Sequence, residues 1–111
     1  MTSTEKAREL ALALPGAEER DHHGRPSFRV GGRIFATLWD GGHMNVMVDE
    51  EGIRTYVEGD GEVFAEVWWG KRLAAVRVAL ALVGERELGA LLADAWEQKA
   101  PARLRAAGGR C

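Results

Sequence analysis

Two glycine pairs, Gly31-Gly32 and Gly41-Gly42, divide a middle section that is rich in β-forming residues. Glycine adopts the positive φ angles of tight hairpin turns, so each pair predicts a turn between antiparallel strands. The strands expected around these turns are residues 27–30, 33–39 and 44–48, which would form a meander. In the first hairpin we expect Phe28 to face Phe35. One face would then carry Phe28, Val30, Phe35 and Trp39, and the other Ile34, Ala36 and Leu38.

Amphipathic helices are predicted on both sides of this section, because apolar residues recur at helical spacing over residues 3–14 and 86–99. Thr2 followed by Glu5 has the form of a capping box for the first helix. Pro15-Gly16 should end that helix, because proline cannot donate the next helical hydrogen bond. Residues 17–26 are polar and are expected to be irregular.

The second half of the chain predicts a short helix, a hairpin and the long helix. Asp49 would cap the short helix, and residues 63–69 and 73–82 would pair in the hairpin. Pro101 should end or kink the last helix, and residues 103–111 are expected to fray. This order predicts an α+β fold with two layers: a mainly antiparallel sheet of about five strands with the N- and C-terminal helices on one face.

Length and composition limit the number of domains and the cellular compartment that we expect. A chain of 111 residues with 46% hydrophobic content can bury one core, so we expect a single domain over residues 1–111. The lone cysteine, Cys111, excludes an intramolecular disulfide and a cysteine-based zinc site. The first residues lack the basic and apolar regions of a signal peptide, and no apolar run reaches about 18 residues, so a cytoplasmic protein without a membrane segment is expected.

The sequence carries no motif that predicts catalysis. Neither Ser3 nor Ser27 lies in Gly-x-Ser-x-Gly, and no phosphate-binding glycine loop is present. His22-His23 and His43 are the candidate metal ligands, but adjacent residues in an extended segment point in opposite directions, so we expect no metal site. A non-enzymatic protein without a cofactor is therefore expected, and a metal- or carboxylate-dependent enzyme is a third interpretation.

Aromatic and basic side chains supply the candidate binding residues. Trp68-Trp69 precede Lys71-Arg72, and stacking aromatics beside cations bind single strands and phosphates. One of these tryptophans should face the core, and the other is either exposed to a partner or covered by a helix, with burial favoured. Arg25, Arg29 and Arg33 surround the first hairpin, with Arg29 and Arg33 on opposite faces. Because the net charge is −2, binding to nucleic acid would require a local basic patch.

Three separated motifs resemble the MmcQ/YjbR family. They are residues 14–18 (Leu-Pro-Gly-Ala-Glu), the hairpin segment 26–36, and Ala95-Trp96 with Pro101. The resemblance implies a compact two-layer fold and a DNA-binding protein, and it brings no established catalytic site. The chain departs from the family pattern at residues 73–77, where a Gly-Trp-Val-like stretch is usual.

Two functions follow as hypotheses. The first is non-enzymatic DNA binding through the basic residues Arg25, Arg29, Arg33, Lys71 and Arg72. The second is a protein-interaction or small-ligand module, self-association included, in which an uncovered sheet face presents Trp39, Trp68 or Trp69.

Overall fold

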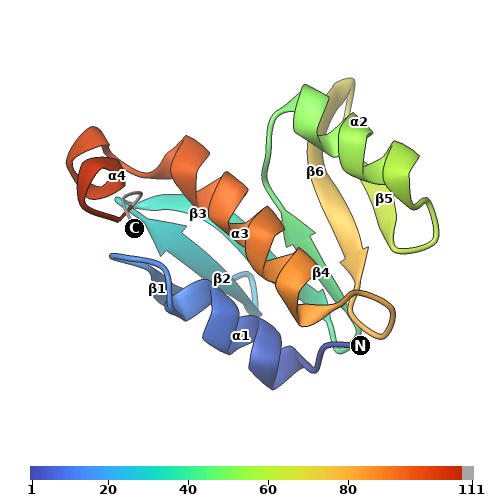
Figure 1. The fold of residues 1–111 in the computed structure, drawn as a ribbon, viewed down its shortest axis with the longest axis horizontal. Coiled ribbons are helices and arrows are strands. Elements are labelled where there is room, and N and C mark those ends of the chain that lie inside the picture. Colours follow the sequence, from blue (N-terminus) through green and yellow to red (C-terminus); the bar gives the residue numbers. More distant parts are fainter. Residues whose placement is uncertain (109–111) are drawn as a thin grey trace.

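The computed structural model describes residues 1–108, and the side chains of residues 1–105. Within this part the elements run in the order α1 (Thr4–Leu12), β1 (Glu18–His22), β2 (Arg25–Val30), β3 (Arg33–Asp40), β4 (His43–Val46), α2 (Glu50–Gly59), β5 (Phe64–Trp69), β6 (Arg72–Ala79), α3 (Glu85–Lys99) and α4 (Ala102–Gly108). The strands form one sheet in the order β1-β2-β3-β4-β6-β5, and every neighbouring pair is antiparallel (Figure 1). The sheet has six strands where about five are predicted.

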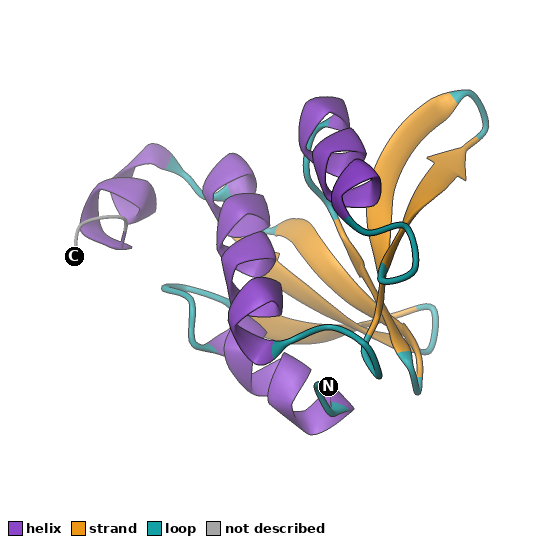
Figure 2. Cartoon of the chain, turned by 45° about the vertical axis from the view of Figure 1, so that its right-hand side comes forward, coloured by secondary structure: helices purple, strands orange, loops and turns teal. Residues whose placement is uncertain are grey.

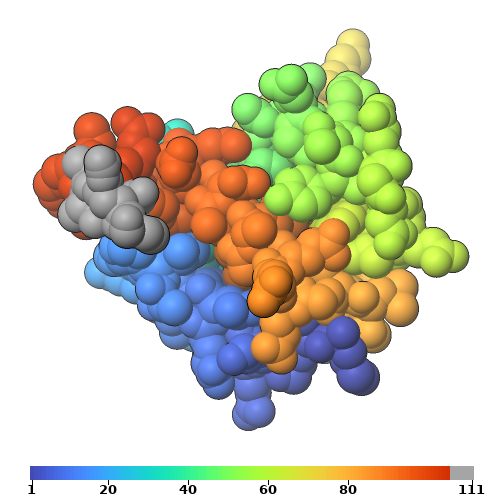
Figure 3. All heavy atoms as spheres, in the orientation of Figure 1, coloured from blue at the N-terminus to red at the C-terminus, as the bar shows by residue number. Residues whose placement is uncertain are grey.

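The helices lie on one side of this sheet, which confirms the predicted two-layer α+β fold. α1 packs against α3, α3 lies across β3 and β4, and α2 covers β5 and β6 (Figure 1). Seen as spheres from this side, α1, α3 and α2 follow one another across the molecule (Figure 3). Among the described residues, the opposite face of the sheet carries no helix (Figure 2). We call it the helix-free face.

The core fills the space between the sheet and the helices. Its largest buried side chains include Phe28, Phe35, Phe64, Leu88 and Leu91. Complete burial of such a side chain stabilises the fold by about 1.5–3 kcal/mol. The α3 stripe of Leu88, Leu91, Leu92, Ala95 and Trp96 is buried, as the helical spacing indicates.

Two helix caps are predicted, and one prediction is wrong. Asp49 caps α2 as expected, because its carboxylate accepts a hydrogen bond of 2.8 Å from the Gly52 amide. The cap of α1 is Ser3 and not Thr2, since Ser3 Oγ accepts from the Lys6 amide at 3.0 Å. Thr2 is buried and donates its hydroxyl to the Val83 carbonyl at 2.9 Å, so it ties the N-terminus to the start of α3.

The polar segment that is expected to be irregular forms strand β1. All residues of β1 are exposed, and its sequence has no alternation of apolar and polar residues that would indicate a strand. His23 (φ 56°) and Gly24 (φ 82°) form the turn to β2, and two positive φ angles are typical of a two-residue hairpin turn.

The predicted pairing of Phe28 with Phe35 is wrong because β3 contains an extra residue. Phe28 pairs with Ala36 and Arg29 with Ile34, which leaves Phe35 between them without a partner in β2. A residue inserted in this way shifts the alternation of the strand. Phe35, Ala36 and Leu38 therefore lie in the core with Phe28.

The extra residue Phe35 also decides where Trp39 points, because Leu38 lies in the core and the next residue faces away from it. A second irregularity lies at Trp39 itself. Leu38 pairs with Met44 and Asp40 with His43, so Trp39 is the extra residue at this position. Trp39 lies on the helix-free face, and its expected position beside Phe28 is corrected.

The C-terminal segment differs from the predicted frayed tail. α3 ends at Lys99, and after Pro101 the chain forms α4, whose Leu104 packs against the margin of the core. Residues 109–111 of the predicted tail lie outside the described residues. No helix among residues 1–108 is long and apolar enough to cross a membrane.

Candidate functional site

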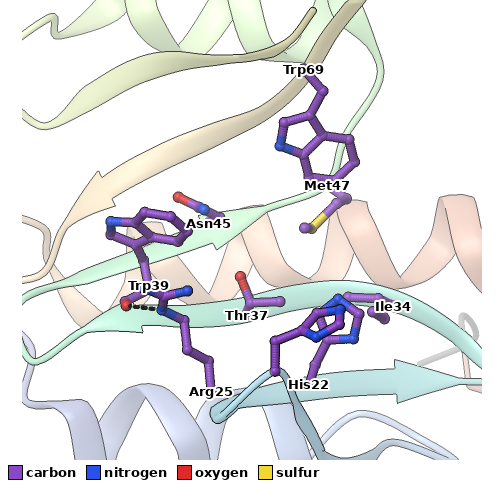
Figure 4. A pocket seen from close by; sticks show the side chains of 9 residues that line it. His22, Arg25, Ile34, Thr37, Trp39, Asn45, Met47 and Trp69 are labelled. Atoms are coloured by element: carbon purple, nitrogen blue, oxygen red, sulfur yellow. Dashed lines mark hydrogen bonds between the residues drawn. The ribbon is translucent and has the colours of Figure 1, made fainter.

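A cavity of about 490 Å³ opens on the helix-free face. The extra residue Phe35 in β3 puts Thr37 and Trp39 on the same face as Ile34, and all three line this cavity. β4 with its continuation adds Asn45 and Met47. The complete lining is His22, His23, Arg25, Ile34, Thr37, Trp39, Asn45, Met47 and Trp69. Figure 4 shows Thr37 near the centre of this group, with Trp39 and Arg25 on one side and Trp69 with Met47 on another.

Trp39 is the centre of a cation–aromatic cluster. The guanidinium carbons of Arg25 and Arg77 lie 4.1 Å and 4.6 Å from the centre of its ring. Arg25 Nε also donates to the Trp39 carbonyl at 2.8 Å, and Arg77 Nε donates to Asn45 Oδ1 at 3.0 Å. These contacts hold both guanidinium groups over the indole ring of Trp39, a residue that remains 37% exposed.

Arg29 adds a third guanidinium group to this face. Its Nε donates to Ser27 Oγ at 3.2 Å, and its Nη2 lies 3.5 Å from His22 Nδ1. We call Arg25, Arg29 and Arg77 the sheet-face arginines. Within residues 1–105, no carboxylate lies at ion-pair distance from any of them, so their positive charge is not neutralised locally. The protein thus has a local basic patch despite its net charge of −2.

His22 and His23 lie together, although an extended segment predicts that they point apart. The left-handed backbone of His23 brings the two ring centres to 4.5 Å, with the rings edge to face, and both rings line the cavity. His43 is elsewhere, at the β3-β4 turn, where its Nδ1 is 3.0 Å from Asp40 Oδ1. In the part of the chain that is described, no group of three or more His, Cys, Asp or Glu residues could hold a metal ion.

The β3-β4 turn and α2 each contain an ionisable group with a shifted pKa. The backbone amide of Gly42 and then the side chain of His43 hold the pKa of Asp40 below its ordinary value. Burial, followed by the charge of Asp94, raises the pKa of Tyr56 to about 12. Neither group lines the cavity.

The predicted basic residues fall into two separate groups. Arg25 and Arg29 belong to the sheet-face arginines, whereas Arg33 pairs with buried Val30 and lies near Lys99 of α3. Partial burial, followed by the positive charges of Arg33 and Arg72, lowers the pKa of Lys99. Lys71 is exposed in the β5-β6 turn. The structure therefore does not join all the predicted cations in one surface.

Arg77 is a site residue that is not among the basic residues predicted from the sequence. It is flanked in β6 by Val76 and Val78, which are both fully buried. A charged residue between two buried neighbours in a strand must point to the opposite face, so this local pattern could have identified it.

The two adjacent tryptophans are both exposed, at 48% for Trp68 and 51% for Trp69, so the expectation that one is buried is wrong. Their hairpin extends beyond α2 (Figure 2), and Ala74 is an extra residue that shifts the pairing near them. Trp69 lines the cavity and lies under Arg72, with 5.6 Å from the guanidinium carbon to the ring centre. Trp68 lies outside the lining and donates its indole N–H to Glu66 at 3.0 Å.

Comparisons with known proteins agree on the fold and the family. The crystal structure of Deinococcus radiodurans protein DR2400, described as a DUF419 domain, matches with a TM-score of 0.76 at 21% sequence identity, over 100% of this chain and 91% of that one. That likeness shows the fold. No curated protein matches the chain. The family model described as YjbR matches residues 12–98. This chain therefore belongs to the YjbR family.

Proposed function

We propose that this chain is a non-enzymatic DNA-binding protein that binds DNA on the helix-free face. The observation that carries the proposal is that Arg25 and Arg77 stack on the exposed ring of Trp39 without a carboxylate partner among residues 1–105. Guanidinium groups hold phosphates through paired hydrogen bonds, and aromatic rings stack with bases.

The distribution of charge also favours the helix-free face as the DNA-binding surface. Arg8 and Arg54, on the helix side, are paired with Glu19 and Glu66, whereas the sheet-face arginines bond to neutral atoms of the protein. An arginine held by a neutral acceptor keeps its net charge, so it can attract a phosphate while its position is already fixed. The cavity lining contains no carboxylate, so phosphates that approach it meet no repulsion from the lining itself.

The test measures DNA affinity by fluorescence anisotropy at ~50 mM salt and at rising salt. Arg29→Gln and Arg77→Gln each remove one cation from the face. Each variant should reduce the steepness of log K against log salt by about 0.7 for single strands or 0.9 for duplex DNA, if the arginine contacts one phosphate. Arg86→Gln is the matched control, because Arg86 is exposed in the first turn of α3 on the helix side.

Two outcomes contradict the proposal. One is the lack of any binding at ~50 mM salt, where phosphate contacts are strong. The other is an equal loss of slope in Arg86→Gln, which would show that the total charge of the protein affects binding but the position of the arginine does not.

The exposed aromatics favour a second candidate, contact with a protein or a second copy through the same face. Trp39 and Trp69 offer apolar area that such a contact would bury. Self-association in sedimentation, weakened by Trp39→Ala and unaffected by DNA, would support this second function in place of the first.

A further inference from the structure

We infer that the cavity on the helix-free face holds one unstacked heteroaromatic base, so that the protein takes bases from single-stranded DNA rather than from a duplex. The inference rests on the proposed function for the source of the base. The same base chemistry is also present in a free nucleotide, and the experiment below separates the two sources.

The floor of the cavity carries polar groups that are ready for a ligand. Thr37 and Asn45 are cross-strand partners in β3 and β4, and they are only 8% and 3% exposed. Asn45 Oδ1 accepts from Arg77, which leaves the amide nitrogen of Asn45 as a donor. Within the described part of the chain, neither that nitrogen nor the Thr37 hydroxyl has a side-chain hydrogen bond, and both residues line the cavity.

These two groups suit the edge of a base. Directly opposed side chains on one face of an antiparallel pair lie about 5 Å apart at Cβ. An amide N–H₂ beside a hydroxyl therefore offers adjacent hydrogen-bonding groups, and the edge of a base presents adjacent donors and acceptors. Both atoms remain open to solvent, because no fully buried side-chain nitrogen or oxygen among the described residues lacks a hydrogen-bond partner. A wholly apolar ligand would cover them and exclude water without offering a partner, which is costly.

The walls suit the flat faces of a base. Trp69 lies on one side of the cavity and the Trp39-Arg25 pair on another, while Met47 beside Trp69 and Ile34 beside His22 add apolar surface (Figure 4). A simple anion such as phosphate would leave this aromatic and apolar surface in contact with water. A volume of about 490 Å³ is in the range of small-ligand sites and is far too small for a duplex. In duplex DNA the faces of the bases are already stacked, whereas a single strand exposes them.

The phosphate of a nucleotide bound in this way would lie at the rim of the cavity. Arg25 lines the cavity, and Arg77 reaches it through Trp39 and Asn45. A nucleotide whose base enters the cavity therefore keeps its charged phosphate near the sheet-face arginines. This arrangement of stacking surfaces beside cations is the one that binds single strands.

The experiment compares two neighbouring tryptophans. Trp69 lines the cavity and Trp68 does not, although both are about half exposed at the end of β5. Single-stranded oligodeoxynucleotides of about 10 nucleotides are titrated against each variant. Trp69→Ala should weaken binding by roughly 5- to 150-fold, the loss expected for one stacked base, whereas Trp68→Ala should leave the affinity within about 2-fold.

A second variant tests the floor without changing the shape of the site. Thr37→Val removes the hydroxyl and keeps the branched side chain, so its unfolding midpoint in urea should match that of the natural chain. Its affinity for the oligonucleotide should fall by about 2- to 10-fold, the range for one lost hydrogen bond. The equivalent duplex should bind more weakly than the single strand and should respond little to Trp69→Ala.

The outcomes separate this inference from the proposed function. Binding that depends on the sheet-face arginines but is equally weakened, or equally unaffected, in Trp68→Ala and Trp69→Ala would overturn the base site and leave DNA binding in place. If the natural chain does not bind DNA at all, mononucleotides decide the matter by nuclear magnetic resonance. Shifts of Thr37 and Asn45 that are lost in Trp69→Ala would support the base site with a free nucleotide as its source, and unchanged spectra would refute it.

Discussion

The contact between α4 and the loop after α1 gives a sharp test of the fold, because it depends on one glycine. Gly16 has a φ of +71°, and a Cβ at this position would lie 2.9 Å from Leu104 Cδ1. Gly24 has a similar φ of +82°, but a Cβ there would meet nothing within 4 Å. Gly16→Ala and Gly24→Ala therefore share a backbone cost and differ in the contact with Leu104.

The size of the difference follows from these contacts. A left-handed conformation costs a residue with a Cβ about 1–2 kcal/mol, and both variants should lose that much. In Gly16→Ala, Leu104 must also move away from the new methyl group. Full burial of a leucine is worth about 1.5–3 kcal/mol, and Leu104 is half-buried, so we expect a further loss of about 1 kcal/mol.

Urea unfolding followed by tryptophan fluorescence measures this difference. Trp96 donates its indole N–H to the Pro15 carbonyl at 2.8 Å, so it reports on the neighbourhood of Gly16. With a slope of about 1–3 kcal/mol per molar urea, Gly16→Ala should have a midpoint about 0.3–1 M below that of Gly24→Ala. The additional loss should disappear in a Leu104→Ala background, because the clashing methyl group is then absent. Equal midpoints for the two glycine variants, or an additional loss that persists without the Leu104 side chain, would refute the docking of α4.

Two further predictions concern α2. Tyr56 donates to Asp94 at 3.2 Å, and Asp94→Asn should lower the pKa of Tyr56 from about 12 toward 10 without reaching it, because burial remains the largest cause. Tyr56 is the only tyrosine, so a near-ultraviolet titration of tyrosinate measures the value directly, and an unchanged pKa would contradict the role of Asp94. Because the pKa is raised in the folded state, the stability from Tyr56 is fully present below about pH 10 and is lost as the pH rises toward 12. Asp49→Ala removes the cap of α2 and should cost about 0.5–2 kcal/mol in the free energy of unfolding, whereas an unchanged urea midpoint would mean that the bond to Gly52 contributes nothing.

The fold was predictable where the sequence is periodic. The stripe of α3 and the paired glycines around β3 follow from spacing alone, and both are present in the structure. Strand β1 was not predictable in this way, because all its residues are polar and exposed and it is defined by its pairing with β2. Thr2 shows the same limit, since its hydroxyl bonds to Val83, far away in the sequence, and not to the helix that follows it.

The candidate site was only partly predictable, because extra residues in the strands decide which side chains face it. Alternation counted from Phe28 puts Trp39 in the core, and the insertion at Phe35 reverses that result. Arg25 and Arg29 were identified from the sequence, while the partner that stacks with Arg25 on Trp39 comes from β6, far along the chain. A left-handed histidine is uncommon, so the pairing of His22 with His23 could not be expected from their adjacency.

The all-polar sequence of β1 affects how readily two molecules can associate through their sheet edges at high protein concentration. β1 is an edge strand of the sheet, so its outer backbone N–H and C=O groups could pair with a strand of another molecule. β1 contains side chains of both charges and no apolar residue. A strand that paired with it would remove water from these charges and bury little apolar surface. The other edge strand, β5, ends in Trp68 and Trp69, which are both about half exposed, so charged side chains do not discourage pairing at that end. We therefore expect unwanted sheet-to-sheet association, where it occurs, to begin at β5.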